Sequence, residues 1–292
     1  MSIIKKRAIH MMIGVSLSLF LPIAVCSQSS EFSQESRRKL QKRESVIQNE
    51  IDELKSHPWG GRYLYGGPFS SFQLTIAPES GFAFSSSGCM GIYGLNYGTV
   101  QATDGLLKLD PQEKNRRGDP WGISTELFLI SWGERHYLIP ATQILNFINA
   151  INAGFEPRKT VSGLFFLKWG DEYRPVVGKP NLPPEYADYL LENPIQARIT
   201  SHQETRVEGD AVRSTVVLDV GKAQGVRVGM QFYFQNSLRY YPPAVITAVN
   251  DSNSVAELVQ FLGGMEQLSP RPGLPLSTLA GRADLNEVAG PS

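Results

Sequence analysis

The stretch Val216–Phe234, VVLDVGKAQGVRVGMQFYF, decides the fold of the last third of the chain. Apolar residues alternate with polar ones on both sides of three glycines, Gly221, Gly225 and Gly229. Glycine accepts the backbone angles of tight turns, which residues with a Cβ resist. Because β-branched and aromatic residues in period-two alternation favour strands, the stretch predicts two strands joined by structural turns at these glycines.

The region around this stretch is rich in short segments that favour β-structure. The predicted strands are 195–200, 211–220, 226–234, 244–249, 254–259 and 275–278. Polar residues at Asn250–Asn253 predict a turn between two of these strands, since such residues favour tight turns. We therefore expect a small β-barrel over residues 195–279, followed by a disordered tail over residues 280–292.

The same glycine pattern resembles a module of exported bacterial proteins. The residues that carry the resemblance are Gly221, Gly225, Val226, Gly229, Met230, Ala244, Ile246 and Val249. Their order is similar to that in the small β-barrel modules of the periplasmic rod-shape protein and of flagellar assembly protein T. The resemblance covers roughly a quarter of the chain. It implies a role in assembly or interaction, and no catalytic residue transfers with it.

The N-terminus has the layout of a secretory signal peptide. Three cations at 5–7 precede an apolar run at 11–25, which is shorter than the roughly 20 residues of a membrane span. We expect residues 1–26 to be removed and the protein to be periplasmic or secreted. Lipidation of Cys26 is the alternative, and it is not favoured because Val25 stands where lipoprotein signals usually carry Gly, Ala or Ser.

A polar linker and an amphipathic helix are expected over residues 27–57. The helix is predicted at 37–55, with its apolar residues on one face. These residues are Leu40, Ile47, Ile51 and Leu54. The helix either packs on the domain that follows or binds a partner chain, and the sequence favours packing.

Residues 58–194 predict an antiparallel β-meander domain with covering helices. Its predicted strands are 71–77, 81–85, 91–97, 99–103 and 106–109. A Gly/Trp/Tyr opening followed by repeated hairpins makes the region similar to lipocalin-type barrels. That resemblance implies an apolar ligand in the barrel mouth, whereas filling of the barrel by its own side chains is the favoured interpretation. The whole chain is thus expected to be mainly β with a few helices.

Two similar segments and two helices complete this domain. Residues 127–139 and 164–177 each predict a strand, a Trp-Gly-acid turn and a second strand. The best helical pattern lies between them at 141–153, where Gly154 is placed to end the helix. A second short helix is predicted at 185–192, after a Pro-Pro pair.

Composition and motifs give no basis for catalysis, a cofactor or a metal. Lys and Arg total 28, as do Asp and Glu, so no cationic excess favours nucleic acid. His57, His136 and His202 lack the spacing of zinc ligands. Cys89, flanked by glycines, is the one candidate nucleophile, although a base such as histidine would have to activate it and burial in a strand is the more ordinary explanation.

Tyrosines are the candidate contact residues. Those in the glycine-rich meander, which could line a cleft for a sugar or an apolar ligand, are Tyr63, Tyr65, Tyr93 and Tyr97. Packing inside the domain is the favoured interpretation for these four. Tyr240 and Tyr241 precede two prolines in a predicted loop, and tyrosine is enriched at protein interfaces. We expect this pair to contact a partner.

The leading functional hypothesis is an exported, non-enzymatic bacterial envelope protein that acts through protein interaction or assembly. The partner would be another envelope protein, and membrane contact would be limited to the signal peptide or a lipidated Cys26. The alternative is a protein that binds a small apolar ligand or a sugar in a lipocalin-like cavity. The third hypothesis is a hydrolase that depends on Cys89.

Overall fold

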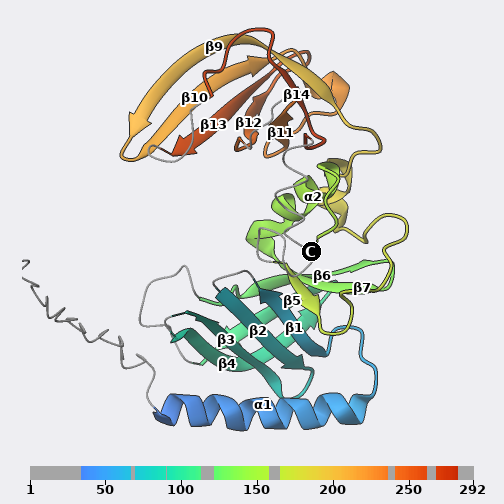
Figure 1. The fold of residues 1–292 in the computed structure, drawn as a ribbon. Helices are drawn as coiled ribbons and strands as arrows, with labels where there is room; N and C mark the ends of the chain where they lie inside the picture. The colour runs from blue at the N-terminus through green and yellow to red at the C-terminus, as the bar shows by residue number, and fades with distance from the viewer. Residues whose placement is uncertain are drawn as a thin grey trace, which may run out of the picture.

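A computed structural model describes residues 34–66, 70–89, 91–112, 122–157, 165–235, 241–261 and 268–281 of the 292-residue chain. Two closed β-barrels with few helices make up these residues (Figure 1), which confirms the predicted fold class. The expected signal peptide with Cys26 lies outside the described residues. So do Tyr240 and most of the predicted C-terminal tail.

The first barrel is an eight-stranded antiparallel meander in which β8 closes onto β1. Its strands are β1 (Gly61–Gly66), β2 (Ser70–Ala77), β3 (Gly81–Gly88), β4 (Gly91–Thr103), β5 (Leu106–Pro111), β6 (Glu126–Trp132), β7 (Arg135–Pro140) and β8 (Phe166–Lys168). The predicted break near Gly98 is wrong, because β4 runs through it. Gly98 is needed there for close packing, since a Cβ would collide with the backbone oxygen of Asp110. The Asp104–Gly105 hairpin is confirmed, and both residues have positive φ.

Large apolar side chains fill the interior of the first barrel. Those that pack together there include Tyr63, Phe72, Leu74, Phe84, Leu127 and Phe166. Alternation along each strand sends these residues inward. The barrel core is therefore built from its own side chains.

Helix α1 (Gln34–Leu54) lies across the outside of β2, β3 and β4. Leu40 and Ile47 are buried against the sheet. Polar bonds reinforce this contact: Arg43 donates to the backbone oxygen of Gly98 at 3.2 Å. The carboxylate of Glu50 accepts from the backbone N–H of Ser80 at 2.6 Å. The apolar face of α1 thus packs on the domain that follows, as the favoured interpretation predicted.

Helix α2 (Ile144–Asn152) follows a short 3₁₀ turn, η1 (Ala141–Gln143), in the crossing from β7 to β8. The predicted helix is confirmed, and Gly154 follows its end with a φ of +86°. The prediction of a second Trp-Gly hairpin is wrong after β8 (Phe166–Lys168), because its second strand does not form. Residues 171–177 form no strand because Asp171 draws them over the β6–β7 turn, where its carboxylate accepts from the His136 backbone N–H at 2.9 Å. The helix predicted at 185–192 is a 3₁₀ helix, η2 (Pro184–Tyr189).

The second barrel has the strand order β10-β13-β12-β11-β14-β9. Its strands are β9 (Gln196–Glu208), β10 (Ala211–Leu218), β11 (Gln231–Phe234), β12 (Ala244–Val249), β13 (Ser254–Phe261) and β14 (Pro275–Ser277), with a 3₁₀ turn η3 (Lys222–Gln224) before β11. The strand predicted at 226–234 begins only at Gln231, because positive φ values at Gly225 and Gly229 make the preceding residues a turn. β9 extends through residues 202–208, which had not been predicted as strand.

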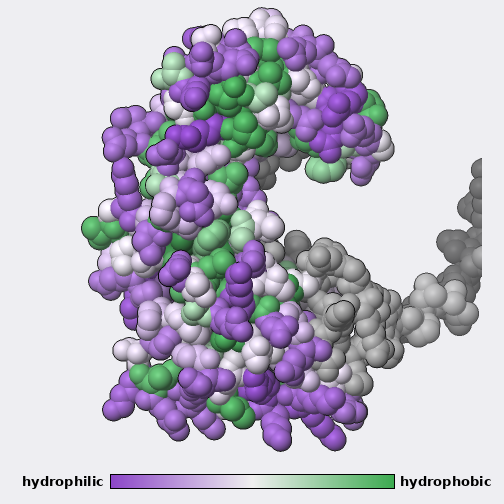
Figure 2. Space-filling model, turned by 180° about the vertical axis from the view of Figure 1, so that it is seen from behind, coloured by the Kyte–Doolittle hydropathy of each residue, from purple (hydrophilic) through white to green (hydrophobic). Residues whose placement is uncertain are grey.

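Helix α2 joins the two barrels. The Asn149 amide donates to the backbone oxygen of Gly229 at 2.9 Å and accepts from the backbone N–H of Gln231 at 3.3 Å. The Ala280 N–H donates to the Ala153 oxygen at 3.1 Å. The barrels lie at opposite ends of α2 (Figure 1), and the molecule has a hollow outline like the letter C (Figure 2).

Candidate functional site

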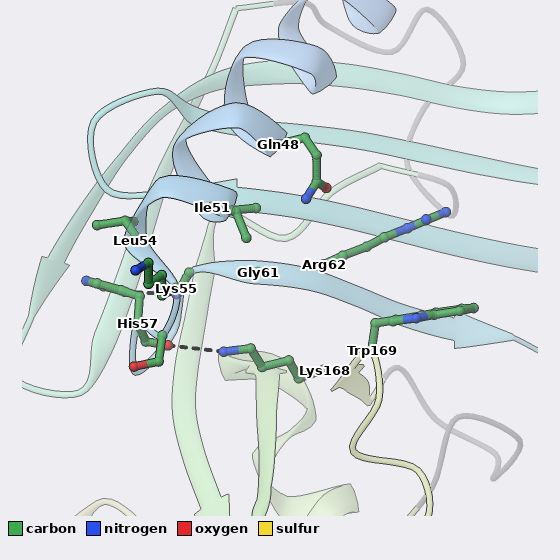
Figure 3. A pocket seen from close by; sticks show the side chains of 11 residues that line it. Gln48, Ile51, Leu54, Lys55, His57, Gly61, Arg62, Lys168 and Trp169 are labelled. Atoms are coloured by element: carbon green, nitrogen blue, oxygen red, sulfur yellow. Dashed lines mark hydrogen bonds between the residues drawn. The ribbon is translucent and has the colours of Figure 1, made fainter.

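A cleft of about 380 Å³ lies where α1 ends, β1 begins and β8 ends (Figure 3). Three cationic residues, Lys55, Arg62 and Lys168, contribute to its wall together with His57 and Trp169. Among the described residues that line it, none is acidic. The closure of β8 onto β1 creates the cleft, because it brings Lys168 beside Tyr63 although the two are far apart in sequence.

The loop between α1 and β1 fixes the back of this cleft. Lys55, directly after the helix, has a φ of +54°, which costs a non-glycine residue about 1 kcal/mol or more. His57 Nδ1 accepts from the backbone N–H of Gly60 at 2.9 Å, so a neutral His57 carries its proton on Nε2. The Lys168 side chain packs over Gly61: a Cβ on Gly61 would lie 2.8 Å from Lys168 Cε. Lys168 Nζ donates to the backbone oxygen of His57 at 3.1 Å.

The pKa values of Lys168 and His57, which both line this cleft, are lowered. Burial lowers the pKa of Lys168; Asp171 counteracts this effect, and the charge of Arg174 adds to it. Burial and the charge of Lys168 together lower the pKa of His57. Burial is the larger cause for both groups and disfavours a charge of either sign, whereas the smaller effects of Arg174 and Lys168 are repulsions between cations that a bound anion would relieve.

Trp169 forms an open aromatic wall. Its side chain is 58% exposed, and the guanidinium of Arg62 lies 5.3 Å from its ring centroid. The Trp169 backbone N–H donates to the Arg62 oxygen at 2.7 Å, so the β1–β8 pairing positions both residues. In Figure 3, Arg62 and Trp169 extend side by side, away from His57.

A second cleft of about 410 Å³ continues along α1 and shares Gln48 and Arg62 with the first. Its other lining residues are Glu44, Ser45, Asn49, Gln73 and Thr75. Arg62 donates to the Gln73 side-chain oxygen at 2.6 Å. Burial raises the pKa of Glu44, against the opposing effects of Arg62 and Gln73. The two clefts together form a groove that is cationic and aromatic at one end and, at the other, rich in amides and hydroxyls around the Glu44 carboxyl.

The structure does not gather the candidate tyrosines into one site. Tyr63 is buried, and its hydroxyl donates to the Trp59 backbone oxygen at 3.0 Å. Tyr65 packs against Phe72 inside the first barrel. Tyr93 and Tyr97 are half-buried on β4, Tyr97 on the side that faces α1. Tyr241 is half-buried against Phe234 in the second barrel.

The glycines of the opening stretch serve two different purposes. Gly225 and Gly229 have φ values of +85° and +89°. Gly221 has extended backbone, and a Cβ there would collide with the Asn250 backbone oxygen. At Gly229 a Cβ would lie 2.8 Å from the Leu145 side chain of α2, so this glycine also lies in close contact with α2.

Cys89 is exposed in the β3–β4 turn and not buried in a strand. The described histidines are engaged elsewhere: His57 binds Gly60, His136 pairs with Asp171 at 2.9 Å, and His202 contacts Thr205 at 2.8 Å. Over the described ranges, no group of three His, Cys, Asp or Glu residues is arranged to hold a metal ion.

A second candidate site is the outer edge of β9. β9 pairs with β14 only at residues 196–198, and the Ile199 N–H bonds to Leu274 just beyond. From Thr200 to Glu208 every residue is exposed, and in the described part of the chain no strand pairs with this edge. Two irregularities in its pairing with β10 favour the bent course visible in Figure 1, because β-bulges bend strands.

The turn after β9 determines which backbone groups face that edge. Gly209–Asp210 is a two-residue loop, and Gly209 has the positive φ of +62° that a type II′ turn requires first. The two residues that flank such a loop, Glu208 and Ala211, form a hydrogen-bonded pair. Along an antiparallel ladder, hydrogen-bonded pairs alternate with pairs that share no hydrogen bond. Arg206 therefore bonds to its partner on β10, whereas Thr205 and Val207 turn their backbone groups outward.

The sequence interpretation missed both sites. Lys55, Arg62 and Lys168 belong to segments whose contact depends on barrel closure, and Trp169 was interpreted as part of a hairpin turn. The alternation of Thr205, Val207 and their charged neighbours was the available signal for a longer β9.

Comparison of the chain with protein-family models, curated proteins and solved structures found no match. Within the described residues, no helix is long and apolar enough to cross a membrane.

Proposed function

We propose that this is a non-enzymatic protein of the bacterial envelope, exported by its N-terminal segment, that acts by binding another protein. The observation that carries the proposal is the exposed edge of β9 from Thr200 to Glu208. An unpaired edge offers a row of backbone donors and acceptors to an extended segment of a partner, which adds as a further strand.

The side chains around this edge favour a selective contact. Arg206 and Arg213 each pair with Glu257 of β13, at 3.2 and 2.8 Å. Arg213 also pairs with Glu208 at 2.7 Å. Such charges oppose indiscriminate strand addition, and they favour a partner strand whose charges complement the Arg/Glu row. The Val207 side chain, 64% exposed, adds an apolar contact point.

The filled first barrel supports interaction over carriage of a ligand inside a cavity. Phe84, Leu74 and Phe166 occupy the position that a lipocalin ligand would take. Interaction of this kind needs no reactive group.

Site-specific photo-crosslinking tests the proposal. A photoreactive residue at Val207 should trap one partner, and the same residue at Lys222, on η3 of the same barrel, should not. The purified partner should then bind the wild-type protein at least tenfold more tightly than Val207→Pro, since proline removes an outward N–H without removing a ladder bond. Circular dichroism should show that this variant is folded. Equal affinity for the two proteins would overturn the proposal.

A further inference from the structure

We propose that the groove between α1 and the β1–β8 pair binds a short anionic saccharide, with its acidic group at Lys168 and Lys55 and a sugar ring on Trp169. This site is separate from the β9 edge and does not depend on the proposed protein interaction. Three features of the groove support it: its charge, its aromatic wall and its polar continuation.

The charge of the cleft selects an anion. Lys55 and Lys168 line the first cleft together with His57, and Arg62 extends from the same cleft along Trp169 (Figure 3). No carboxylate is among the described residues that line this cleft. No hydrogen bond or ion pair joins the Lys55 side chain to the described residues, and the left-handed backbone of Lys55 places it at the cleft at a conformational cost. Lys168 donates to a backbone oxygen, and the Asp171 carboxylate acts on it through charge and not through a hydrogen bond, so its Nζ can still donate to a ligand.

The aromatic wall selects a ligand with a flat, partly apolar face. Arg62 covers part of the Trp169 ring, and the side chain remains 58% exposed. Exposed tryptophan offers a large apolar surface with little conformational freedom, which makes it an effective contact residue. The apolar C–H face of a sugar ring matches this surface.

The polar continuation selects a ligand with many hydroxyl groups. Beyond Arg62 the groove presents the Glu44 carboxyl, which accepts from the Gln73 amide at 3.2 Å. The other side chains there are amides and hydroxyls, namely Ser45, Gln48, Asn49, Gln73 and Thr75. The amides and hydroxyls donate and accept hydrogen bonds without imposing charge, and burial raises the pKa of Glu44, which favours its neutral form. Cleft volumes of about 380 and 410 Å³ lie within the range of about 300–1,000 Å³ for small-molecule sites. A compact inorganic anion would leave this second cleft unused.

Isothermal titration calorimetry of the full chain tests the inference with three probes: a uronic-acid disaccharide, its neutral parent disaccharide and inorganic phosphate. We expect the uronic-acid probe to bind at least tenfold more tightly than either of the others. Lys168→Gln should weaken its binding at least tenfold, and so should Trp169→Ala. Lys222→Gln removes an exposed cation of the second barrel and should leave the affinity unchanged.

Each other outcome overturns a stated part of the inference. Equal binding of the neutral disaccharide would refute the role of the cations. Phosphate that binds as tightly as the uronic-acid probe would refute the saccharide and leave a simple anion site. Absence of binding at about 10 mM would refute the site itself. None of these results would affect partner binding at β9.

Discussion

Asn149 holds the two barrels together, and its replacement gives a sharp test of the architecture. The residue is 4% exposed on α2. Its amide group satisfies one backbone acceptor and one backbone donor of the second barrel, at Gly229 and Gln231. Asn149→Ala leaves both groups without this partner.

The expected loss follows from these two bonds. An unsatisfied buried polar group costs about 1–3 kcal/mol. Because Gly229 and Gln231 are only half-buried, the lower part of that range applies to each. We expect Asn149→Ala to lower the free energy of unfolding by about 2–3 kcal/mol. With a urea m-value of about 2–3 kcal/mol/M, the unfolding midpoint should fall by about 1 M.

Urea unfolding followed by circular dichroism measures this loss, and small-angle scattering should show a larger radius of gyration as the barrels separate. Asn146→Ala is the matched control: Asn146 lies on the same helix and is exposed, and its side chain bonds to Gln143, on the same segment of chain. It should cost less than about 0.5 kcal/mol. Asn149→Asp keeps the acceptor for Gln231 but turns a buried carboxylate towards the Gly229 oxygen, so it should cost at least as much as Asn149→Ala. Equal midpoints for Asn149→Ala and Asn146→Ala would refute the reasoning.

Three further predictions concern the turns, the core and the cleft. Gly225→Ala should cost about 1–2 kcal/mol for its positive φ alone, and Gly229→Ala should cost more because a Cβ there meets Leu145; equal losses in urea unfolding would contradict this contact. Phe84→Ala should lower the free energy of unfolding by about 3–5 kcal/mol, because it leaves a cavity in a filled barrel, and a loss below about 1 kcal/mol would contradict that packing. The pKa of His57 is lowered by burial and by Lys168, so the unfolded chain takes up a proton more readily and stability should fall as the pH drops from 7 through the ordinary value of 6.5 to below the lowered pKa. His57→Asn keeps a side-chain acceptor without titrating, and a pH series of unfolding curves with the same slope in both proteins would argue against this assignment.

Local patterns were sufficient to predict most elements of the first barrel. The alternation in β2 and the Asp104–Gly105 turn identified the meander, and the apolar stripe with Gly154 identified α2. These features depend on residues close in sequence, where steric preference and periodicity act directly.

The errors arose where tertiary contacts override local preference. The apolar alternation before Gln231 predicted a strand, but the Gly229 N–H bonds to Ile246 and the chain turns. The segment after Trp169 is β-prone in sequence, yet Asp171 holds it over the β6–β7 turn. Neither partner can be inferred from the segment itself.

The candidate sites depend on contacts over still longer separations. Lys168 reaches His57 across 111 positions, and only closure of the barrel joins them. The sequence does not predict the second half of β9 because its polar composition is also typical of a loop. In both cases the chemistry of the residues was visible in the sequence and their proximity was not.

Amide hydrogen exchange of the full-length protein tests the proposed interaction most directly. It is measured for the protein alone and after addition of the purified partner that crosslinking identifies. In the free protein the amides of Thr205 and Val207 should exchange rapidly and that of Arg206 slowly, as the hairpin register requires. On addition of the partner, the Thr205 and Val207 amides should become protected by at least 100-fold. Saturating binding that leaves these two amides fast would contradict strand addition at β9.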